Sequence, residues 1–197
     1  HPARSQHLAV AKVVIVGLGG TGAYLLDMLA KVPIDQIHLY DADRFATHNA
    51  FRAPGAASID DLNAGLTKVE YHARNYGAMR RGIVPHPIYV TQENVTEILD
   101  ADFVFIAMDA GDDKRAIVEA LIAAQVPFID TGIGVSNDEG GIGGQVRITA
   151  GLPGRTEHIA RDNLISYALG DDVEYESNVQ IAEINALAAI QAVIKFK

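Results

Sequence analysis

A run of β-branched residues that leads straight into a cluster of glycines constrains the fold of this chain more than any other segment. Val13 to Val16 form the run, and Gly17-Leu18-Gly19-Gly20-Thr21-Gly22 follows at once. A helical pattern then extends from Ala23 to about Lys31. The segment therefore predicts a strand, a tight turn and a helix, in that order.

The glycines of this turn have physical roles that a side chain would prevent. Gly17 permits the sharp turn off the strand, and Gly22 lets the helix pack closely on the strand. Gly19 or Gly20 removes the side chain that would hold a phosphate away. The start of the helix directs free backbone N–H groups and the positive end of its dipole at an anion. We expect a nucleotide there, with a glycine-rich turn that binds nothing as the alternative.

The next predicted strand places two acids beside the turn. This strand runs from about Ile34 to Tyr40 and is followed by Asp41-Ala42-Asp43. Open α/β sheets bind ligands at the carboxyl ends of their strands, so both carboxylates face the same crevice as the glycines. Asp41 lies at the sequence distance at which an acid reaches the ribose hydroxyls. The alternative for Asp41 and Asp43 is an ordinary turn after a strand.

The remaining segments predict an α/β fold with a doubly wound, mainly parallel sheet and a Rossmann-like nucleotide-binding turn. Further strands are expected at 83–90, 103–107, 126–130 and 145–149, and helices at 67–76, 95–99, 112–124 and 179–196. The strand at 145–149 suggests pairing at the far side of the sheet, with an antiparallel orientation open. The helix at 179–196 is apolar on more than one face, so it either packs on another subunit or is buried in this one.

Two polar stretches and a third acid belong to the same crevice. Arg44 to Gly55 shows no sustained period, and a loop rich in Ala, Asp and Gly follows from Ala56 to Leu66. Long irregular stretches in a compact domain are more often functional than filler, so we interpret this region as a lid or binding loop. Asp109 follows the buried strand at 103–107 and reaches the same edge as Asp41. Its alternative role is to cap the helix that starts near Asp112.

Composition limits the partners and the chemistry. A chain of 197 residues fits one domain with a sizeable core, so we expect a single domain over residues 1–197. No segment of about twenty apolar residues could span a membrane, and a net charge of -9 disfavours nonspecific binding to nucleic acid. Neither a membrane nor a nucleic acid is therefore an expected partner. The absence of cysteine removes disulfides, thiolate metal sites and a cysteine nucleophile from this chain.

The start of the chain and its histidines carry less information. His1 to His7 hold neither an initiator methionine nor an apolar signal core, so we expect a chain cut from a longer protein and, by default, a cytoplasmic one. Five histidines are scattered without the spacing of metal ligands, and we interpret them as structural or surface groups. They are His38, His48, His72, His86 and His158.

Several of these residues recur in a fixed order in one known family. The order here is the glycine turn, the Asp41-Ala42-Asp43 motif, Asn49 with Arg52, Gly65-Leu66-Thr67-Lys68, and Asp109 followed by Arg115. With these motifs the chain resembles the adenylating domain of ubiquitin-activating enzymes and their bacterial ThiF/MoeB relatives, over nearly its whole length. Five ordered matches are far more specific than a single glycine motif.

The resemblance implies a role for each matched position. The turn from Gly17 to Gly22 would hold the phosphates of ATP, and Asp41, with Asp43 beside it, would bind the ribose hydroxyls. Asp109 would hold Mg²⁺. Three further residues would contact the triphosphate: Asn49, Arg52 and Lys68.

Adenylation chemistry itself needs such groups. When a carboxylate attacks the α-phosphorus, negative charge builds on the nonbridging oxygens and on pyrophosphate, which a guanidinium, an ammonium and Mg²⁺ stabilise. Arg52, Lys68 and Asp109 are therefore the expected catalytic residues. Taken singly, Arg52 and Lys68 could also be solvated surface charges.

The chain also departs from the family pattern. Many members carry a catalytic cysteine that takes the activated carboxyl, and often paired C-x-x-C motifs for zinc, whereas this chain has neither. The cysteine could lie elsewhere in a longer protein, the acyl-adenylate could pass to an external nucleophile, or the chain could be a partner subunit. Members commonly reach an arginine across a dimer, for which Arg4 is the only candidate at the extreme N-terminus.

The leading hypothesis is an ATP- and Mg²⁺-dependent adenylyltransferase, a homodimer, that activates the C-terminal carboxylate of a ubiquitin-like or sulfur-carrier protein. The substrate tail could lie between Asp109 to Arg115 and the Gly132 to Gly144 loops, where absent side chains admit an extended peptide. One alternative is a noncatalytic nucleotide-binding scaffold that pairs with a catalytic subunit. The other is an NAD-dependent oxidoreductase, which a glycine turn with Asp41 would also suit.

Overall fold

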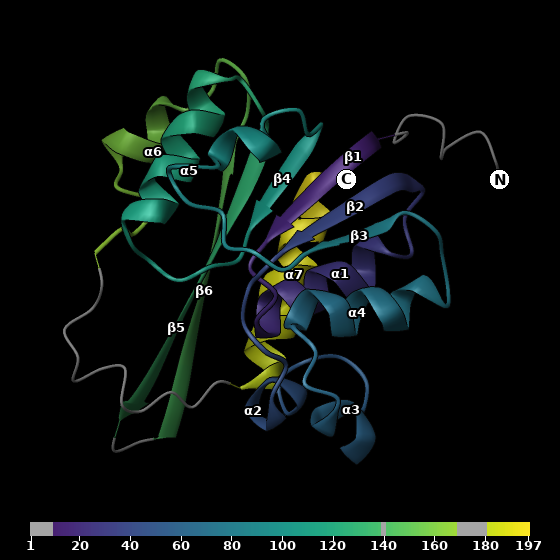
Figure 1. Cartoon of the computed structure of the whole chain (residues 1–197). Coiled ribbons are helices and arrows are strands. Elements are labelled where there is room, and N and C mark those ends of the chain that lie inside the picture. Colours follow the sequence, from purple (N-terminus) through teal and green to yellow (C-terminus); the bar gives the residue numbers. More distant parts are fainter. Residues whose placement is uncertain (1–9, 139–140, 169–180) are drawn as a thin grey trace, which may run out of the picture.

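A six-stranded sheet with the order β3-β2-β1-β4-β5-β6 forms the centre of the molecule (Figure 1). In this computed structural model, which describes residues 10–138, 141–168 and 181–197, β1 to β5 run parallel and β6 pairs antiparallel with β5. The expected doubly wound, mainly parallel sheet is therefore confirmed, and so is the antiparallel strand at its edge. The strands are β1 Val10–Val16, β2 Ile34–Tyr40, β3 Ile83–His86, β4 Phe103–Ile106, β5 Phe128–Asp138 and β6 Gly141–Gly151.

Two of the helices, α3 and α4, begin at side-chain caps. At α4 the Thr67 hydroxyl accepts the backbone N–H of Glu70, and the Glu70 carboxylate accepts that of Thr67, a reciprocal capping box. Ser58 and Asp61 cap α3 in the same way, inside the stretch that we expected to be a loop. The helices are α1 Gly20–Leu29, α2 Thr47–Ala50, α3 Ile59–Asn63, α4 Lys68–Gly77, the 3-10 helix η3 Val95–Ile98, α5 Asp112–Ala123, α6 Glu157–Arg161 and α7 Ala182–Phe196.

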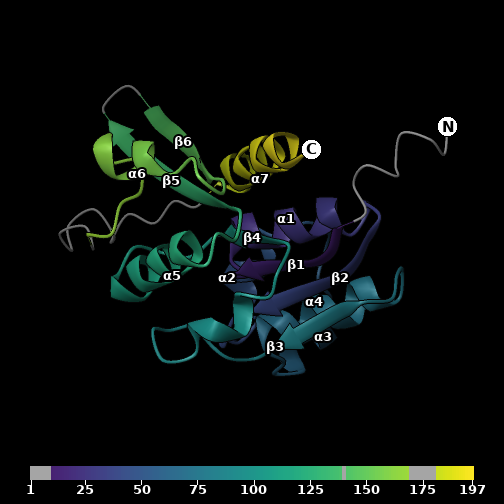
Figure 2. The same ribbon diagram turned by 90° about the horizontal axis from the view of Figure 1, so that it is seen from above.

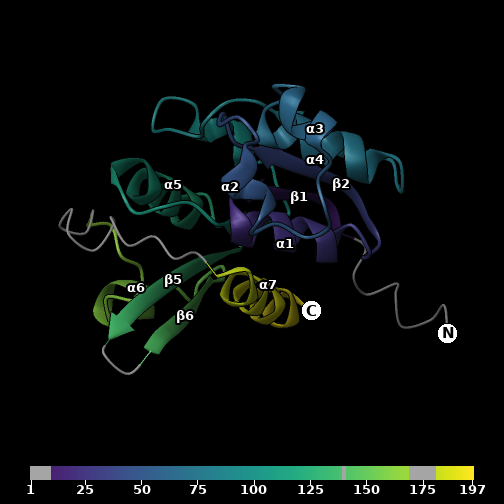
Figure 3. The same cartoon turned by 90° about the horizontal axis from the view of Figure 1, so that it is seen from below.

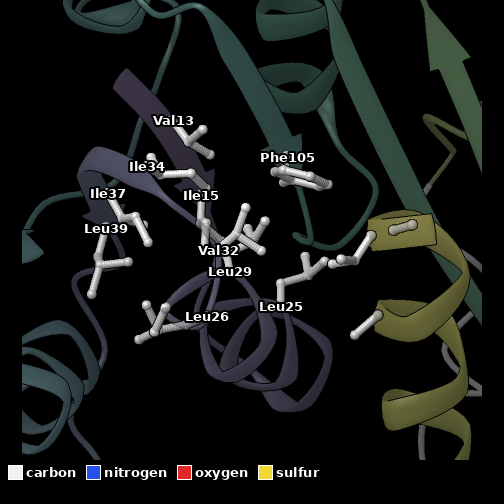
Figure 4. Packing of buried hydrophobic residues seen from close by; sticks show 14 of the residues in the cluster. Val13, Ile15, Leu25, Leu26, Leu29, Val32, Ile34, Ile37, Leu39 and Phe105 are labelled. Carbon is white, nitrogen blue, oxygen red and sulfur yellow. The ribbon is translucent and has the colours of Figure 1, made fainter. Parts of the chain in front are cut away.

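Strand β1 separates two apolar layers. Val13 and Ile15 are fully buried on the side of α1, where Figure 4 shows them with Leu25 and Leu29. Val14 and Val16 point to the opposite face and pack in the cluster that includes Ile117, Val118 and Leu121 of α5. Both faces of the parallel sheet are covered, which explains the unbroken apolar run in the sequence.

The C-terminal helix α7 belongs to the core of this chain. It packs on α1 and on the β5–β6 pair (Figures 2 and 3). Ala188, Ala189 and Ala192 are fully buried on that side, while Leu187, Ile190 and Ile194 are exposed. Burial within this chain, one of the two alternatives, therefore accounts for one face of the helix, and an apolar face is left at the surface.

The glycine-rich segment after β4 was predicted incorrectly. The Gly132 to Gly144 region was expected to form loops, but its described residues belong to β5 and β6, which pair from Phe128–Gly151 to Asp138–Gly141. Strand β4 pairs with β5 only as far as Asp130, so the rest of the β5–β6 pair projects beyond the sheet (Figure 1). The glycines leave room for a side chain to cross the strand, because Arg147 of β6 lies directly opposite Gly132.

Candidate functional site

A cavity of about 900 Å³ opens at the carboxyl ends of the parallel strands. The turn after β1, the end of β2, the segment between β4 and α5, the β5–β6 pair and the start of α7 contribute to its walls. The strand order reverses between β1 and β4, and ligands of doubly wound sheets bind at such a switch point. The cavity is therefore where the fold places a ligand.

The glycine turn forms one wall of this cavity. Gly17 has a φ of +90°, and a Cβ atom there would overlap the carbonyl oxygen of Ala107 at the end of β4. A Cβ atom on Gly22 would overlap the carbonyl oxygen of Gly17, so Gly22 does allow the close approach of helix and strand. A Cβ atom on Gly19 would meet no atom within 4 Å, because that position faces the open cavity. Gly19 is thus a position at which a ligand could approach the backbone closely.

Asp41, Asp43 and Lys68 form a connected charge cluster beside the turn. One Asp41 oxygen accepts the Leu18 N–H at 2.7 Å, and the other accepts the Asp43 N–H at 2.9 Å. The buried Lys68 ammonium lies 3.3 Å from Asp41 and 2.6 Å from Asp43. Asp41 therefore fixes the turn to the end of β2, and Lys68 binds both acids.

Asp43 is the exposed member of this cluster, with 51% of its side chain accessible. Burial alone would raise the pKa of Asp43, but hydrogen bonds from Lys68 and from the Tyr89 hydroxyl outweigh it and lower the pKa. Asp43 is therefore an ionised acceptor at the cavity wall. Lys68 is not the solvated surface charge of the alternative interpretation, because it is buried.

Arg52 and Asp109 face the cavity from two different loops. Burial lowers the pKa of the Arg52 guanidinium, and the charge of Asp109 opposes that effect. The Nε atom of Arg52 is buried and has no hydrogen-bond partner among the described residues. An unpaired buried donor is costly, so this arginine suits an anionic ligand. Asp109 is exposed and precedes Gly111, which is the residue at the N-cap of α5.

Asn49 and Arg115 point elsewhere. Asn49 is the buried residue of α2, its Oδ1 accepts the Ala46 N–H at 2.9 Å, and it does not line the cavity. The Arg115 guanidinium carbon lies 4.9 Å from the centre of the Tyr167 ring. Arg4 lies outside the described residues. Asn49 could therefore support the Arg52 loop, whereas direct contact with a triphosphate stays a prediction.

A second buried charge cluster lies across the cavity. Asp130, at the start of β5, is fully buried, and the Lys114 ammonium of α5 lies 2.7 Å from its Oδ1. The Arg147 guanidinium lies 3.7 Å from Oδ2, an ion pair beyond hydrogen-bonding distance. Lys114 also donates to the carbonyl of Met108 at 3.4 Å, next to Asp109. Burial raises the pKa of Asp130, although the charges of Lys114 and Arg147 oppose it.

Comparison with known proteins identifies the family to which this chain belongs. The family model of the ThiF family matches residues 1–194. The chain belongs to the ThiF family. Among curated proteins it is similar to the tRNA threonylcarbamoyladenosine dehydratase of Escherichia coli K12, with 29% identity over 147 residues, 72% of this chain and 50% of that protein.

Solved structures of this ThiF-family fold agree. The structure of E. coli MccB with MccA-N7isoASN matches with a TM-score of 0.70 at 23% identity, over 94% of this chain and 56% of that one. MccB with ATP matches with a TM-score of 0.69 at 22% identity, over 98% and 57%. The E. coli tRNA N6-threonylcarbamoyladenosine dehydratase TcdA matches with a TM-score of 0.60 at 25% identity, over 68% and 61%. The chain spans about half the length of these relatives.

The sequence interpretation missed four residues of this ThiF-family site. Lys114 precedes Ile117 and Leu121 at helical spacing, so the pattern could have placed it on the buried face of α5. Asp130 ends the predicted strand at 126–130, so the rule that placed Asp41 and Asp109 at the carboxyl edge could have placed it there as well. Arg147 and Asn185 become neighbours of the cavity only through tertiary contacts, and Asn185 accepts a hydrogen bond from Thr21 of α1 at 2.9 Å.

The described residues also limit how a metal could be held and whether a helix could cross a membrane. No cluster of three or more His, Asp or Glu side chains in that part of the chain could hold a metal ion alone. A magnesium ion usually needs only one or two carboxylates plus phosphate oxygens, so Asp109 could share one with a nucleotide. No helix in the described ranges combines the length and the apolar character that crossing a membrane requires.

Proposed function

We propose that this ThiF-family chain is an ATP- and Mg²⁺-dependent adenylyltransferase that activates the C-terminal carboxylate of a ubiquitin-like or sulfur-carrier protein. The observation that carries the proposal is the convergence of Arg52, Lys68 and Asp109 on the cavity formed by the glycine turn. These three groups come from separate segments, which argues against independent surface charges. Their charges suit a triphosphate and a cation more than a nicotinamide ring.

The residues support a division of roles at the nucleotide. The turn at Gly19 leaves room for phosphates near the N-terminus of α1, whose free N–H groups attract anions. Asp43 is an ionised acceptor at the cavity wall, and Asp41 is positioned by backbone N–H groups beside it. These carboxylates could accept hydrogen bonds from ribose hydroxyls. Asp109 would contribute to holding Mg²⁺, which would neutralise charge on the phosphates.

Arg52 and Lys68 would act on the reaction itself. A substrate carboxylate oxygen forms a bond to the α-phosphorus, the bond to the β-phosphate bridging oxygen breaks, and pyrophosphate leaves. Negative charge grows on the phosphate oxygens in this step, and fixed cations stabilise it. The buried, unpaired Nε of Arg52 is a donor already desolvated for that purpose.

Exchange of labelled pyrophosphate into ATP tests this function. We expect Mg²⁺-dependent exchange when a carrier protein that ends in Gly-Gly is present. Arg52→Ala and Asp109→Ala should each lower it by about 100-fold or more, since removal of one fixed charge-stabilising group typically has that effect. Arg81→Ala is the matched control, because Arg81 is exposed and lies outside the cavity.

The same assay separates the alternatives. ATP binding without exchange for any carrier would favour the noncatalytic scaffold, and binding of NAD without ATP would favour the oxidoreductase. The assay is also run with tRNA, because one relative is named tRNA threonylcarbamoyladenosine dehydratase. The net charge of -9 argues against tRNA as the substrate here. Light scattering tests the proposed homodimer, for which the exposed apolar face of α7 is a candidate interface.

A further inference from the structure

The β5–β6 side of the cavity contains an arginine, Arg147, to which the proposed adenylation mechanism assigns no role. Arg147 lines the main cavity together with Ser166, and both also line an adjoining recess of about 220 Å³. The side chain of Arg147 is 36% exposed. Its guanidinium is therefore accessible to a ligand from the cavity.

The strand opposite Arg147 leaves space for this guanidinium. Gly132 of β5 is the register partner of Arg147. A Cβ atom on Gly132 would lie 2.9 Å from Nη2 and 3.2 Å from Cζ of Arg147, closer than such atoms normally approach. The arginine thus lies across the bare backbone of β5 because residue 132 has no side chain.

The charges behind Arg147 leave one positive charge in surplus. Among the residues that the structure describes, Asp130 is the one acid paired in this cluster, and it faces two cations, Lys114 and Arg147. Lys114 makes the short ion pair at 2.7 Å, whereas Arg147 is 3.7 Å away and its buried Nε has no partner among the described residues. Asp130 therefore orients Arg147 without using up its hydrogen-bonding capacity.

Other acids of the cavity lie on a different wall. Asp109, which precedes α5, and Asp112 and Asp113, which begin α5, line it and are exposed. They would repel a second anion on their own side. An anionic group is consequently favoured at the β5–β6 wall, where Arg147 lies.

We propose that Arg147, braced by Asp130 and accommodated by Gly132, binds the free carboxylate at the C-terminus of an extended substrate peptide. The inference rests on the proposed function and names the residue that selects the acid end of the tail. The recess beside Gly132, Gly134 and Ser166 would hold the last backbone units, since two of these residues lack side chains. Arginine suits this task because its planar donors match a carboxylate.

Binding of matched peptides tests the assignment without catalysis. The probes are the ten-residue C-terminal peptides of Gly-Gly-ended carrier proteins, each made as the free acid and as the C-terminal amide, and affinity is measured by calorimetry. For at least one pair we expect the wild type to prefer the acid by about 10-fold or more, as hydrogen bonds to charged groups provide. Arg147→Gln should abolish the preference, and Arg147→Lys should restore part of it.

Two further variants guard against a folding defect. Gly132→Ala keeps every charge but displaces the flexible end of Arg147, so it should reduce the preference by about 3-fold or more while thermal unfolding stays unchanged. Arg155→Gln removes the same charge from the exposed turn after β6 and should keep the full preference.

The outcomes distinguish this inference from the proposed function. An equal preference in the wild type and in Arg147→Gln, or no preference for any acid in the wild type, overturns the role of Arg147. Such a result would not contradict the adenylyltransferase function, which the pyrophosphate exchange assay tests separately. Conversely, a preference that depends on Arg147 without exchange supports the carboxylate site and overturns the adenylyltransferase.

Discussion

The two buried charge clusters on opposite sides of the cavity are built as opposites. On the nucleotide side, one lysine lies between two carboxylates, Asp41 and Asp43. On the β5–β6 side, one carboxylate, Asp130, lies between Lys114 and Arg147. Each cluster thus has three charges, with one negative charge in surplus on the first side and one positive charge on the second.

The two clusters expose charges of opposite sign to the cavity. The most accessible member is Asp43 in the first cluster and Arg147 in the second, with 51% and 36% of the side chains exposed. The central member is buried in both, so it orients the exposed one while the opposite charge offsets its own desolvation. The cavity therefore presents an acceptor at one wall and a donor at the other, which suits sugar hydroxyls and a carboxylate.

The largest expected effect comes from removal of the lysine in each cluster. Lys114→Met leaves the fully buried Asp130 with only the distant Arg147 and should lower the free energy of unfolding by about 3–5 kcal/mol. Lys68→Met should cost less, about 1–3 kcal/mol, because Asp41 keeps two backbone N–H donors. Urea denaturation at neutral pH measures both.

A double variant controls that comparison. Asp130→Asn added to Lys114→Met removes the stranded charge and should recover much of the lost stability. Equal losses of unfolding free energy in Lys114→Met and Lys68→Met would mean that backbone hydrogen bonds do not stabilise the Asp41 carboxylate. The two clusters would then not differ in how they stabilise their buried acids.

Acid should weaken the lysine-centred side through His72, one turn after Lys68 on α4. Burial, and then the charge of Lys68, lowers the pKa of His72 from 6.5 to about 4. Phe45, Tyr71 and Tyr76 surround its ring, and no described residue accepts or donates at its Nε2. The unfolded chain therefore takes up a proton before the folded one does as the pH falls below 6.5.

The resulting stability is present above pH 6.5 and is lost as the pH falls toward 4, to a total of about 3 kcal/mol. His72→Phe should remove this part of the acid sensitivity, because phenylalanine has no proton to bind and suits the aromatic surroundings. Urea denaturation between pH 7 and pH 4 measures it. An identical pH slope in the variant would show that His72 is not responsible.

The two clusters should also differ in the pH at which their carboxylates, Asp130 and Asp43, bind a proton. Burial raises the pKa of Asp130, whereas hydrogen bonds from Lys68 and Tyr89 overcome burial and lower the pKa of Asp43. Carbon-13 NMR of the side-chain carboxyls should therefore show Asp130 binding its proton at a higher pH than Asp43. The reverse order would mean that Lys114 and Arg147 dominate Asp130 and that the positive surplus is smaller than the geometry indicates.

The paired strands β5 and β6 were not predicted from the sequence in the region of Gly132 to Gly144. The cluster of glycines from Gly132 to Gly144 predicts loops. In the structure the side chain of Arg147 on the partner strand covers Gly132 and takes the place of the missing side chain. By contrast, the cap of α4 at Thr67 and Glu70 depends on residues three apart, and that helix begins within one residue of the expected start.

The strand, turn and helix at Gly17 to Gly22, the mainly parallel sheet and the placement of Asp41 and Asp109 in one crevice could be predicted from local sequence, whereas Lys68 was expected there only from the family resemblance. These features follow from local periodicity, from steric demands of the turn and from the rule that parallel strands end at a common edge. The pairing of Asp130 with Lys114 and Arg147 is visible only in the folded protein. Those residues come from different elements, and their pairing depends on burial and register that no short segment encodes.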